Sequence, residues 1–363
     1  IISMTRASGF NPKVTYIKKK SEYSRVLNEV ASFKPQVVGF SSVSSQFSFI
    51  NEIATIIKEN APHVLTVCGG VHPTINPACV VESKNLDGIF VGESDYAFIE
   101  FLENVESKKT YKDTDNFAYA EEGKLVVNKL KPLIANLDEL PYPDKELSPY
   151  REYMQSNNFS PFFFTRGCPY LCSYCSNHAI AETYNLHRND PRYRSPALCV
   201  SEIEETIKKF PTKRVLIGDD TFGLNRKWRK EFLAEYKSRI NIEFICLLRV
   251  DVISEEFVRD LKDAGCYRIS FGVESGNEYV RKEIMRRKMS NKQIVKAFDI
   301  VRKLGVRTNA INIIGVPGET EEMILPYKSD QVLNSRPVLT QAILAINVIL
   351  LADRDVNAAA LPG

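Results

Sequence analysis

Two long stretches of the chain alternate apolar, strand-like runs with segments whose apolar residues recur at helical spacing. The first stretch covers residues 13–101, and the second begins at residue 162 and contains five strand–helix units. Alternation of this kind predicts parallel sheets covered by helices. We therefore expect an α/β chain in which a doubly wound, Rossmann-like domain precedes a partial (β/α)6 barrel.

The predicted strands end in small or polar residues. Ligands bind beyond the carboxyl ends of the strands in open α/β sheets and in barrels. In the barrel, strands are predicted over residues 162–165, 214–217, 242–248, 267–273 and 308–315, and residues 340–351 are expected to form the sixth strand. The unusual polar residues of the barrel are therefore expected to gather on one rim.

The segment between the two stretches has a different pattern. Residues 119–128, with Glu-Glu-Gly at their centre, indicate a β-hairpin, and the prolines of residues 137–144 indicate a linker. The expected organisation is a front domain over residues 1–106 that lacks its first β–α unit. A hairpin and linker (107–158), a barrel (159–351) and an atypical tail (352–363) follow.

Size and charge exclude several classes of protein. The chain has 363 residues, 44% of them hydrophobic and 26% charged, which is ordinary for a globular protein of about two domains. The net charge of +3 is too small to attract nucleic acid or a membrane over a broad surface. The first residues lack the apolar core of a secretory signal. We expect a cytoplasmic protein with no membrane or nucleic-acid partner.

Three of the eight cysteines, Cys168, Cys172 and Cys175, form a C-x3-C-x2-C cluster. Three thiolates this close can bind three irons of a [4Fe–4S] cube and leave the fourth iron without a protein ligand. His178 follows three residues later, so a structural zinc site is an alternative, as are three buried free thiols. We favour the iron–sulfur cluster because zinc ligands usually arrive as paired couples on separate knuckles. The other five cysteines are scattered, which indicates a reducing compartment.

The cysteine cluster, with Tyr174 just before its last cysteine, resembles the radical S-adenosylmethionine (SAM) superfamily. The resemblance extends to YRSP at 193–196, GDDTF at 218–222, RVD at 249–251, FGVESG at 271–276 and IGVPGET at 314–320. It implies that SAM binds the open iron and that an electron from the cluster cleaves SAM to a 5′-deoxyadenosyl radical. It also implies a reduced flavodoxin- or ferredoxin-type electron donor.

The same resemblance implies a set of SAM contacts. Tyr174 is expected near the adenine, and Arg249 is expected to pair with the SAM carboxylate. The segment that approaches the methionine end comprises Gly218, Asp219 and Asp220, and the ribose and carboxylate side comprises Glu274 and Ser275. Taken singly, each of these residues is equally well explained as a strand-end turn, an ion pair or a packing residue.

Residues 13–105 resemble the cobalamin-binding domain that often precedes a radical SAM barrel. The matching segments are VGFSS at 38–42, GGVHPT at 69–74 and GESD at 92–95. Glycines and small hydroxyls at strand ends allow a flat corrin to approach the backbone, although they also suit tight turns. The implied cobalamin contacts are Ser41, Ser42, Gly69, Gly70, His72, Gly92 and Glu93. The chain lacks the Asp-x-His-x-x-Gly sequence whose histidine binds cobalt in some such domains.

The two resemblances together imply an enzyme with three cofactors: a [4Fe–4S] cluster, SAM and cobalamin. We expect a methyltransferase that acts on an unreactive carbon of a small-molecule substrate. A cobalamin-associated radical cyclase or rearrangement enzyme is an alternative within the same class. A zinc-stabilised, non-catalytic α/β binding protein is the alternative from another class, with the basic residues at 281–282 and 286–288 as its nucleic-acid contact.

Overall fold

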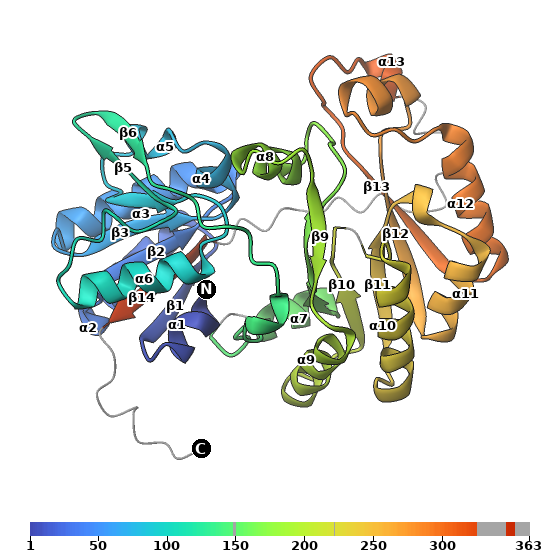
Figure 1. The fold of residues 1–363 in the computed structure, drawn as a ribbon, viewed down its shortest axis with the longest axis horizontal. Helices are drawn as coiled ribbons and strands as arrows, with labels where there is room; N and C mark the ends of the chain where they lie inside the picture. The colour runs from blue at the N-terminus through green and yellow to red at the C-terminus, as the bar shows by residue number, and fades with distance from the viewer. Residues whose placement is uncertain (148–149, 221, 325–345, 353–363) are drawn as a thin grey trace.

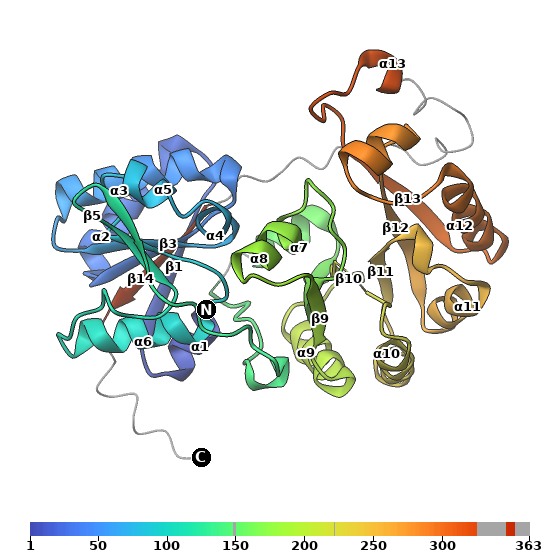
Figure 2. The same cartoon turned by 45° about the horizontal axis from the view of Figure 1, so that its top comes forward.

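The structure is a computed structural model that describes residues 1–147, 150–220, 222–324 and 346–352 (Figure 1). It contains two α/β units, one built on a seven-stranded sheet and one on a five-stranded sheet. The two units lie side by side, and the turned view of Figure 2 shows α8 between them. The expected fold class, a Rossmann-like front domain followed by a partial barrel, is confirmed in these outlines.

The front sheet has the strand order β1-β14-β2-β3-β4-β5-β6. Its helices cover both faces: α2, α3 and α5 pack on one face, and α1 and α6 pack on the other, as in a doubly wound fold. The strands are β1 (Asn11–Ile17), β2 (Val37–Ser41), β3 (Leu65–Gly69), β4 (Gly88–Phe90), β5 (Phe117–Glu121), β6 (Lys124–Val127) and β14 (Ile346–Ala352). The helices are α1 (Ile2–Ala7), α2 (Tyr23–Phe33), α3 (Phe47–Asn60), α4 (Val71–Ile75), α5 (Cys79–Glu82) and α6 (Asp95–Glu106).

Two placements in the front sheet differ from the sequence-based expectation. The hairpin β5–β6 was expected to stand outside the domain, but β5 pairs with β4 and extends the sheet. Residues 346–351 were expected in the barrel, but β14 pairs antiparallel with β1 and with β2. Val348 and Leu350 are fully buried in the core of the front sheet, so β14 is an integral strand of that sheet. Residues 340–345 lie outside the described residues.

The barrel sheet has five parallel strands in the order β13-β12-β11-β10-β7. Its strands are β7 (Ser160–Phe162), β10 (Arg214–Ile217), β11 (Glu243–Leu248), β12 (Cys266–Glu274) and β13 (Arg307–Asn312). Its covering helices are α9 (Pro196–Lys209), α10 (Arg226–Arg239), α11 (Glu255–Asp263) and α12 (Asn291–Lys303). Further elements are α7 (Tyr150–Asn157), α8 (Ser176–Thr183), α13 (Glu321–Ile324), the pair β8 (Thr165–Cys168) and β9 (Asn189–Tyr193), a π-helix over Val280–Ile284, and four short 3-10 helices (Lys20–Glu22, Ser44–Gln46, Leu137–Glu139 and Val250–Val252).

The first barrel strand was expected over residues 162–165, but it divides into two. Strand β7 ends at Phe162, and β8 leaves the barrel to pair antiparallel with β9. The cause is a buried carboxylate: Asp219 Oδ1 accepts hydrogen bonds from the backbone N–H groups of Phe164 (2.6 Å) and Thr165 (2.8 Å). The Asp219 carboxylate, and not a neighbouring strand, accepts the backbone N–H groups of these two residues, and the chain leaves the barrel sheet at this point.

Candidate functional site

The three clustered cysteines line one cavity of about 210 Å³ at the carboxyl ends of the barrel strands. Cys168 ends β8, Cys172 lies in the following loop, and Cys175 caps the amino end of α8. Cys172 is buried, the other two are half-buried, and burial raises the pKa of the Cys168 thiol to about 11. Six of the residues expected to contact SAM line the same cavity: Tyr174, Gly218, Asp219, Asp220, Arg249 and Glu274. The seventh, Ser275, does not line it; its side chain is buried and accepts a hydrogen bond from the N–H of Asn277.

Backbone contacts fix the cysteine loop in place. Ser173 donates its N–H to the carbonyl of Met285 (3.0 Å) and its hydroxyl to the carbonyl of Ile284 (2.7 Å). The N–H of Cys175 donates to the carbonyl of Cys172 at 3.1 Å. These hydrogen bonds join the loop to the π-helix that follows β12. The protein therefore arranges the loop through its own backbone.

Two arginines bring positive charge to the buried thiol. Nη1 of Arg287 lies 3.7 Å from Sγ of Cys172, and Nη1 of Arg249 lies 3.9 Å from the same atom. Arg249 also forms an ion pair with Asp251 (2.8 Å) and stacks its guanidinium on the Tyr170 ring at 3.5 Å. Arg287 was not predicted at this site because the basic run at 286–288 has the pattern of a solvated surface.

The carboxylates of the cavity are tuned by burial. Burial raises the pKa of Asp219 to about 7, and Oδ2 of this residue is buried without a hydrogen-bond partner. Burial also raises the pKa of Glu274, against the opposing effect of the Arg287 charge. Glu274 has a φ of 68°, a left-handed conformation that costs a non-glycine residue about 1 kcal/mol. Strain of this kind is often found at functional sites.

The chemistry of these donors fits an iron–sulfur cluster. Three thiols line one cavity that also contains two guanidinium groups, and a cluster with thiolate ligands carries negative charge. Over the described ranges, no group of three or more His, Cys, Asp or Glu side chains, the three cysteines included, is arranged to hold a metal ion, so the fit rests on the kinds of residue that line the cavity. His178, the candidate fourth zinc ligand, has its Nε2 3.7 Å from a carboxylate oxygen of Glu182.

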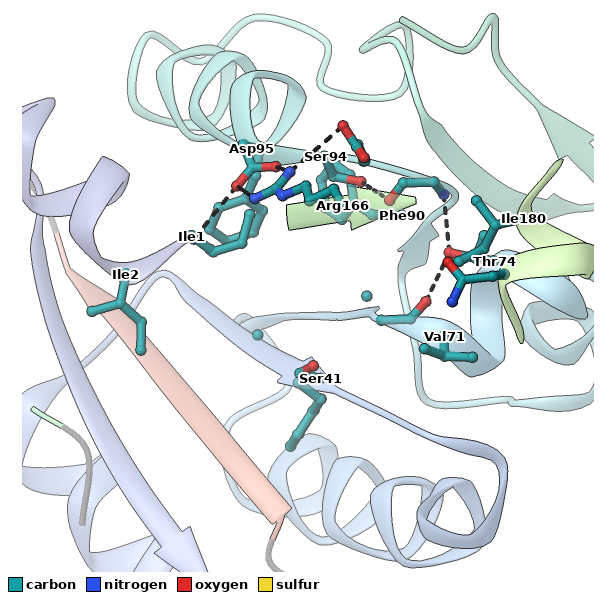
Figure 3. A pocket seen from close by; sticks show the side chains of 18 of the residues that line it. Ile1, Ile2, Ser41, Val71, Thr74, Phe90, Ser94, Asp95, Arg166 and Ile180 are labelled. Carbon is teal, nitrogen blue, oxygen red and sulfur yellow. Dashed lines mark hydrogen bonds and ion pairs between the residues drawn. The ribbon is translucent and has the colours of Figure 1, made fainter. Parts of the chain in front are cut away.

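A second, larger cavity of about 660 Å³ lies between the two domains (Figure 3). Five of the residues expected to contact cobalamin line it: Ser41, Gly69, Gly70, Gly92 and Glu93. Ser42 and His72 do not line it; the His72 ring packs on Phe47, and its Nδ1 lies 3.0 Å from Oγ of Ser44. The barrel side of the cavity includes Arg166 and Ile180.

Glycine allows close approach along the wall of this cavity. Gly70 has a φ of 101°, and a Cβ at this position would lie 2.8 Å from the backbone N of Ser42. Gly92 has a φ of 79°, and a Cβ there would lie 2.1 Å from the hydroxyl of Tyr184, which projects from the barrel domain. These two glycines let neighbouring segments of the protein pack closely, and the small side chains along this wall leave room for a flat, extended ligand such as a corrin.

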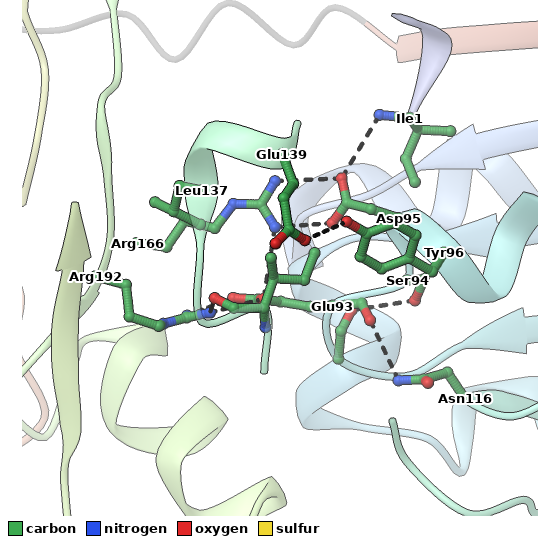
Figure 4. Close-up of polar contacts among 12 residues, drawn as sticks. Ile1, Glu93, Ser94, Asp95, Tyr96, Asn116, Leu137, Glu139, Arg166 and Arg192 are labelled. Atoms are coloured by element: carbon green, nitrogen blue, oxygen red, sulfur yellow. Dashed lines mark hydrogen bonds and ion pairs between the residues drawn. The ribbon is translucent and has the colours of Figure 1, made fainter. Parts of the chain in front are cut away.

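A cluster of ion pairs joins the two domains beside this cavity (Figure 4). Arg166 donates two hydrogen bonds to Asp95, at 2.7 and 3.2 Å, and lies 3.5 Å from Glu93. Nη1 of Arg192 donates at 2.9 Å to Oε2 of Glu93, the same oxygen that lies near Arg166. Burial works to raise the pKa of Asp95, but the hydrogen bonds and charge of Arg166 outweigh it, and the pKa is lowered. Because Arg166 is two residues before Cys168, these pairs connect the cysteine loop directly to the front domain.

The two cavities share part of their walls. Asn177 and Asp220 line both, and Nδ2 of Asn177 donates to Oδ2 of Asp220 at 2.9 Å. Nδ2 of Asn177 also lies 3.7 Å from Sγ of Cys175. A molecule bound at this wall would therefore face the cysteine cavity on one side and the glycine-lined cavity on the other.

Comparisons with known proteins find a matching family for each unit. The B12 binding domain family matches residues 1–102, and the Radical SAM superfamily matches residues 162–327. An uncharacterized methyltransferase of Pyrococcus horikoshii is 26% identical over 306 residues, which cover 83% of this chain and 65% of that protein. The anaerobic magnesium-protoporphyrin IX monomethyl ester cyclase of Rubrivivax gelatinosus is 26% identical over 311 residues, which cover 83% of this chain and 54% of that protein. The chain thus spans between half and two thirds of these relatives.

Solved structures show the same fold. The radical SAM methyltransferase TsrM from Kitasatospora setae, with tryptophan and a SAM analogue bound, superposes with a TM-score of 0.67 at 17% identity, covering 84% of this chain and 61% of that one. The cobalamin-dependent SAM radical enzyme OxsB, with aqua-cobalamin and SAM bound, has a TM-score of 0.67 at 19% identity, covering 89% of this chain and 47% of that one. In the part of the chain that the structure describes, no helix combines the length and apolar character needed to cross a bilayer.

Proposed function

The chain combines a B12-binding domain with a radical SAM domain, and from this pairing we propose that it is a cobalamin-dependent radical SAM methyltransferase. Its substrate would be a small molecule with an unreactive carbon as the methyl acceptor. The observation that carries the proposal is the wall shared by the two cavities at Asn177 and Asp220. Methylation by this route requires the acceptor carbon to be reachable from both cofactors, and a shared wall meets that requirement.

Cys168, Cys172 and Cys175 would hold the cluster, and the residues around them would orient SAM. When bound, the cluster supplies the electron that cleaves SAM, and cobalamin supplies the methyl group. Asp219 Oδ2 is a buried acceptor without a partner, which suits the amino group of SAM. Arg249, held in place by Asp251 and Tyr170, is suited to the SAM carboxylate.

The front domain would hold cobalamin against the barrel. Ser41, Gly69, Gly70 and Gly92 leave the backbone open to a flat ring, and Glu93 is occupied by Arg192. His72 is directed to Ser44 and Phe47, so it does not support a role as a cobalt ligand. The buried position of Cys172 suits the exclusion of water from the cluster.

One further reaction is supported by a specific observation. The cyclase of Rubrivivax gelatinosus matches as much of this chain as the Pyrococcus methyltransferase does, at the same identity. A cyclisation that starts from the same radical is therefore the second candidate. A reduced flavodoxin- or ferredoxin-type protein is proposed as the electron donor, and the cytoplasm as the location.

The test is anaerobic turnover with dithionite as the reductant and SAM as the only added organic reactant. The proposal predicts cluster-dependent release of 5′-deoxyadenosine, which Cys172→Ser abolishes and Cys79→Ala, a buried cysteine of the front domain, leaves unchanged. Hydroxocobalamin should bind with a shifted visible spectrum. A protein that binds neither SAM nor hydroxocobalamin would contradict the proposal. When hydroxocobalamin and dithionite are also added, so that reduced cobalamin can accept the methyl group of SAM, formation of S-adenosylhomocysteine would favour methyl transfer over cyclisation.

A further inference from the structure

Two buried arginines contact the same cysteine sulfur, and they differ in how their charges are balanced. Arg249 and Arg287 are each only 7% exposed. Arg249 is neutralised by Asp251, with Nη2–Oδ2 at 2.8 Å and Nε–Oδ1 at 3.0 Å. The carboxylate paired with Arg287 is Glu274, whose Oε1 lies 3.9 Å from Nη2, at the outer limit of an ion pair. A buried guanidinium without a close carboxylate is unusual.

The position of Arg287 directs one of its N–H groups at Cys172. Its Nε and Nη2 donate to the carbonyl of Gly272 at 3.1 and 2.6 Å. The remaining nitrogen, Nη1, lies 3.7 Å from Sγ of Cys172 and 3.2 Å from the hydroxyl of Tyr174. A Cβ at Gly272 would lie 2.5 Å from Oε1 of Glu274 and 2.9 Å from Nη2 of Arg287, so both side chains would have to shift to accommodate it.

The backbone keeps Arg287 and Cys172 in register. The N–H of Arg287 donates to the carbonyl of Arg281 at 2.8 Å, which closes the turn after the π-helix. Ser173, next to Cys172, is hydrogen-bonded to the carbonyls of Ile284 and Met285 in the same segment. The contact between the guanidinium and the sulfur is therefore a fixed feature of the loop packing.

We propose that Arg287 raises the reduction potential of the [4Fe–4S] cluster by donating a charge-assisted hydrogen bond to the sulfur of Cys172. This inference rests on the proposed function, because it requires the three cysteines to hold that cluster. Reduction adds one electron to the cluster, so a nearby positive charge stabilises the reduced form more than the oxidised form. Hydrogen bonds to the sulfur atoms act in the same direction. Burial makes both effects larger than they would be in water.

The test compares Arg287→Gln with a matched control, Arg286→Gln. Arg286 is the preceding residue in the chain and is exposed, so its replacement removes the same charge from the surface. Each protein is reconstituted anaerobically, its iron and sulfide are counted, and the cluster is titrated with dithionite and mediators while EPR follows the reduced form. SAM is left out, so the measurement does not depend on turnover.

Arg287→Gln is expected to lower the ratio of reduced to oxidised cluster about tenfold at a fixed solution potential, the order of effect of one charge-assisted hydrogen bond. For a one-electron couple this is a shift of about 59 mV to more negative potential. Arg286→Gln should leave the potential unchanged, and Arg287→Lys, which keeps the charge, should fall between wild type and Arg287→Gln. A full cluster in Arg287→Gln at the wild-type potential would overturn the proposal.

Two other outcomes are also decisive. If Arg287→Gln does not assemble a cluster, the reduction potential of the cluster in Arg287→Lys tests the proposal. The lysine ammonium cannot reproduce the geometry of the guanidinium, so a wild-type potential in Arg287→Lys would overturn the proposal. If wild-type protein assembles no cluster, the proposed function fails first and this inference falls with it. The iron and sulfide counts therefore separate the two kinds of failure.

Discussion

The ion pair between Arg166 and Asp95 should couple the two domains with a measurable energy. Arg166 is one-third exposed and Asp95 one-tenth exposed, and two hydrogen bonds join them at 2.7 and 3.2 Å. Charge-assisted hydrogen bonds to buried groups each contribute about 1.5–3 kcal/mol, and partial exposure of the arginine reduces this. We expect Asp95→Asn to cost about 3 kcal/mol, because it leaves Arg166 partly buried beside Glu93 alone.

A double-mutant cycle isolates the interaction. Asp95→Asn, Arg166→Gln and the double variant are unfolded in urea under reducing, anaerobic conditions. The fluorescence of the chain's one tryptophan, Trp228 in α10, reports on unfolding of the barrel. A lower unfolding free energy of the barrel in these variants would therefore reflect stabilisation that the front domain normally provides. The predicted coupling energy is about 2 kcal/mol.

The control is a pair of the same chemistry that carries little energy. Arg188 and Asp190 lie 2.8 Å apart, but their side chains are 57% and 61% exposed. Asp190→Asn should therefore change the unfolding free energy by no more than about 0.5 kcal/mol. The changes in unfolding free energy of Asp95→Asn and Arg166→Gln are summed and compared with the change in the double variant. If the two values agree within about 0.5 kcal/mol, the ion pair does not couple the domains and the prediction is wrong.

Three further substitutions test other parts of the structure. Gly92→Ala should destabilise the domain contact by about 2–4 kcal/mol, because the new Cβ would lie 2.1 Å from the Tyr184 hydroxyl and φ is 79°. Adding Tyr184→Ala to the same chain should recover part of the lost stability in a thermal melt. No recovery would refute the steric cause. Asp219 has a folded-state pKa of about 7, above its unfolded value, so the folded state binds more protons. The free energy of unfolding should therefore fall by on the order of 2 kcal/mol between pH 5 and pH 8. Asp219→Asn should flatten this pH dependence in urea titrations, and an unchanged pH dependence would show that another group causes it. Leu350→Asp places a charge in the buried core of the front sheet and should abolish hydroxocobalamin binding while leaving cluster assembly intact; retention of the cobalamin spectrum would show that β14 is dispensable.

The sequence predicted the parts of the fold that depend on local pattern. Apolar residues at helical spacing predict barrel helices over 199–209, 227–239, 255–264 and 292–304, and the bounds of α9, α10, α11 and α12 differ from these ranges by at most three residues. Apolar periodicity and caps such as Ser290, whose hydroxyl accepts from the N–H of Gln293, are local signals. Most strand ends were also predicted from local pattern. For this reason, most of the polar residues expected at those ends line one of the two cavities.

What the sequence did not predict depends on long-range pairing. A short apolar run such as β14 has the pattern of a strand in either sheet, and only the folded arrangement shows that it lies between β1 and β2. The division of the first barrel strand depends on a carboxylate about 55 residues later in the chain, Asp219. Arg287 was missed because Arg286 and Arg287 look alike in sequence, and their burial differs only in the fold.

The central claim is that the three cysteines hold a [4Fe–4S] cluster with one iron left open for SAM. The most direct measurement is the EPR spectrum of anaerobically reconstituted, reduced protein before and after addition of SAM. The account predicts about four irons and four sulfides per chain and a spectrum that changes when SAM binds. About one zinc per chain with no brown chromophore, or a cluster signal that SAM leaves unchanged, would contradict it.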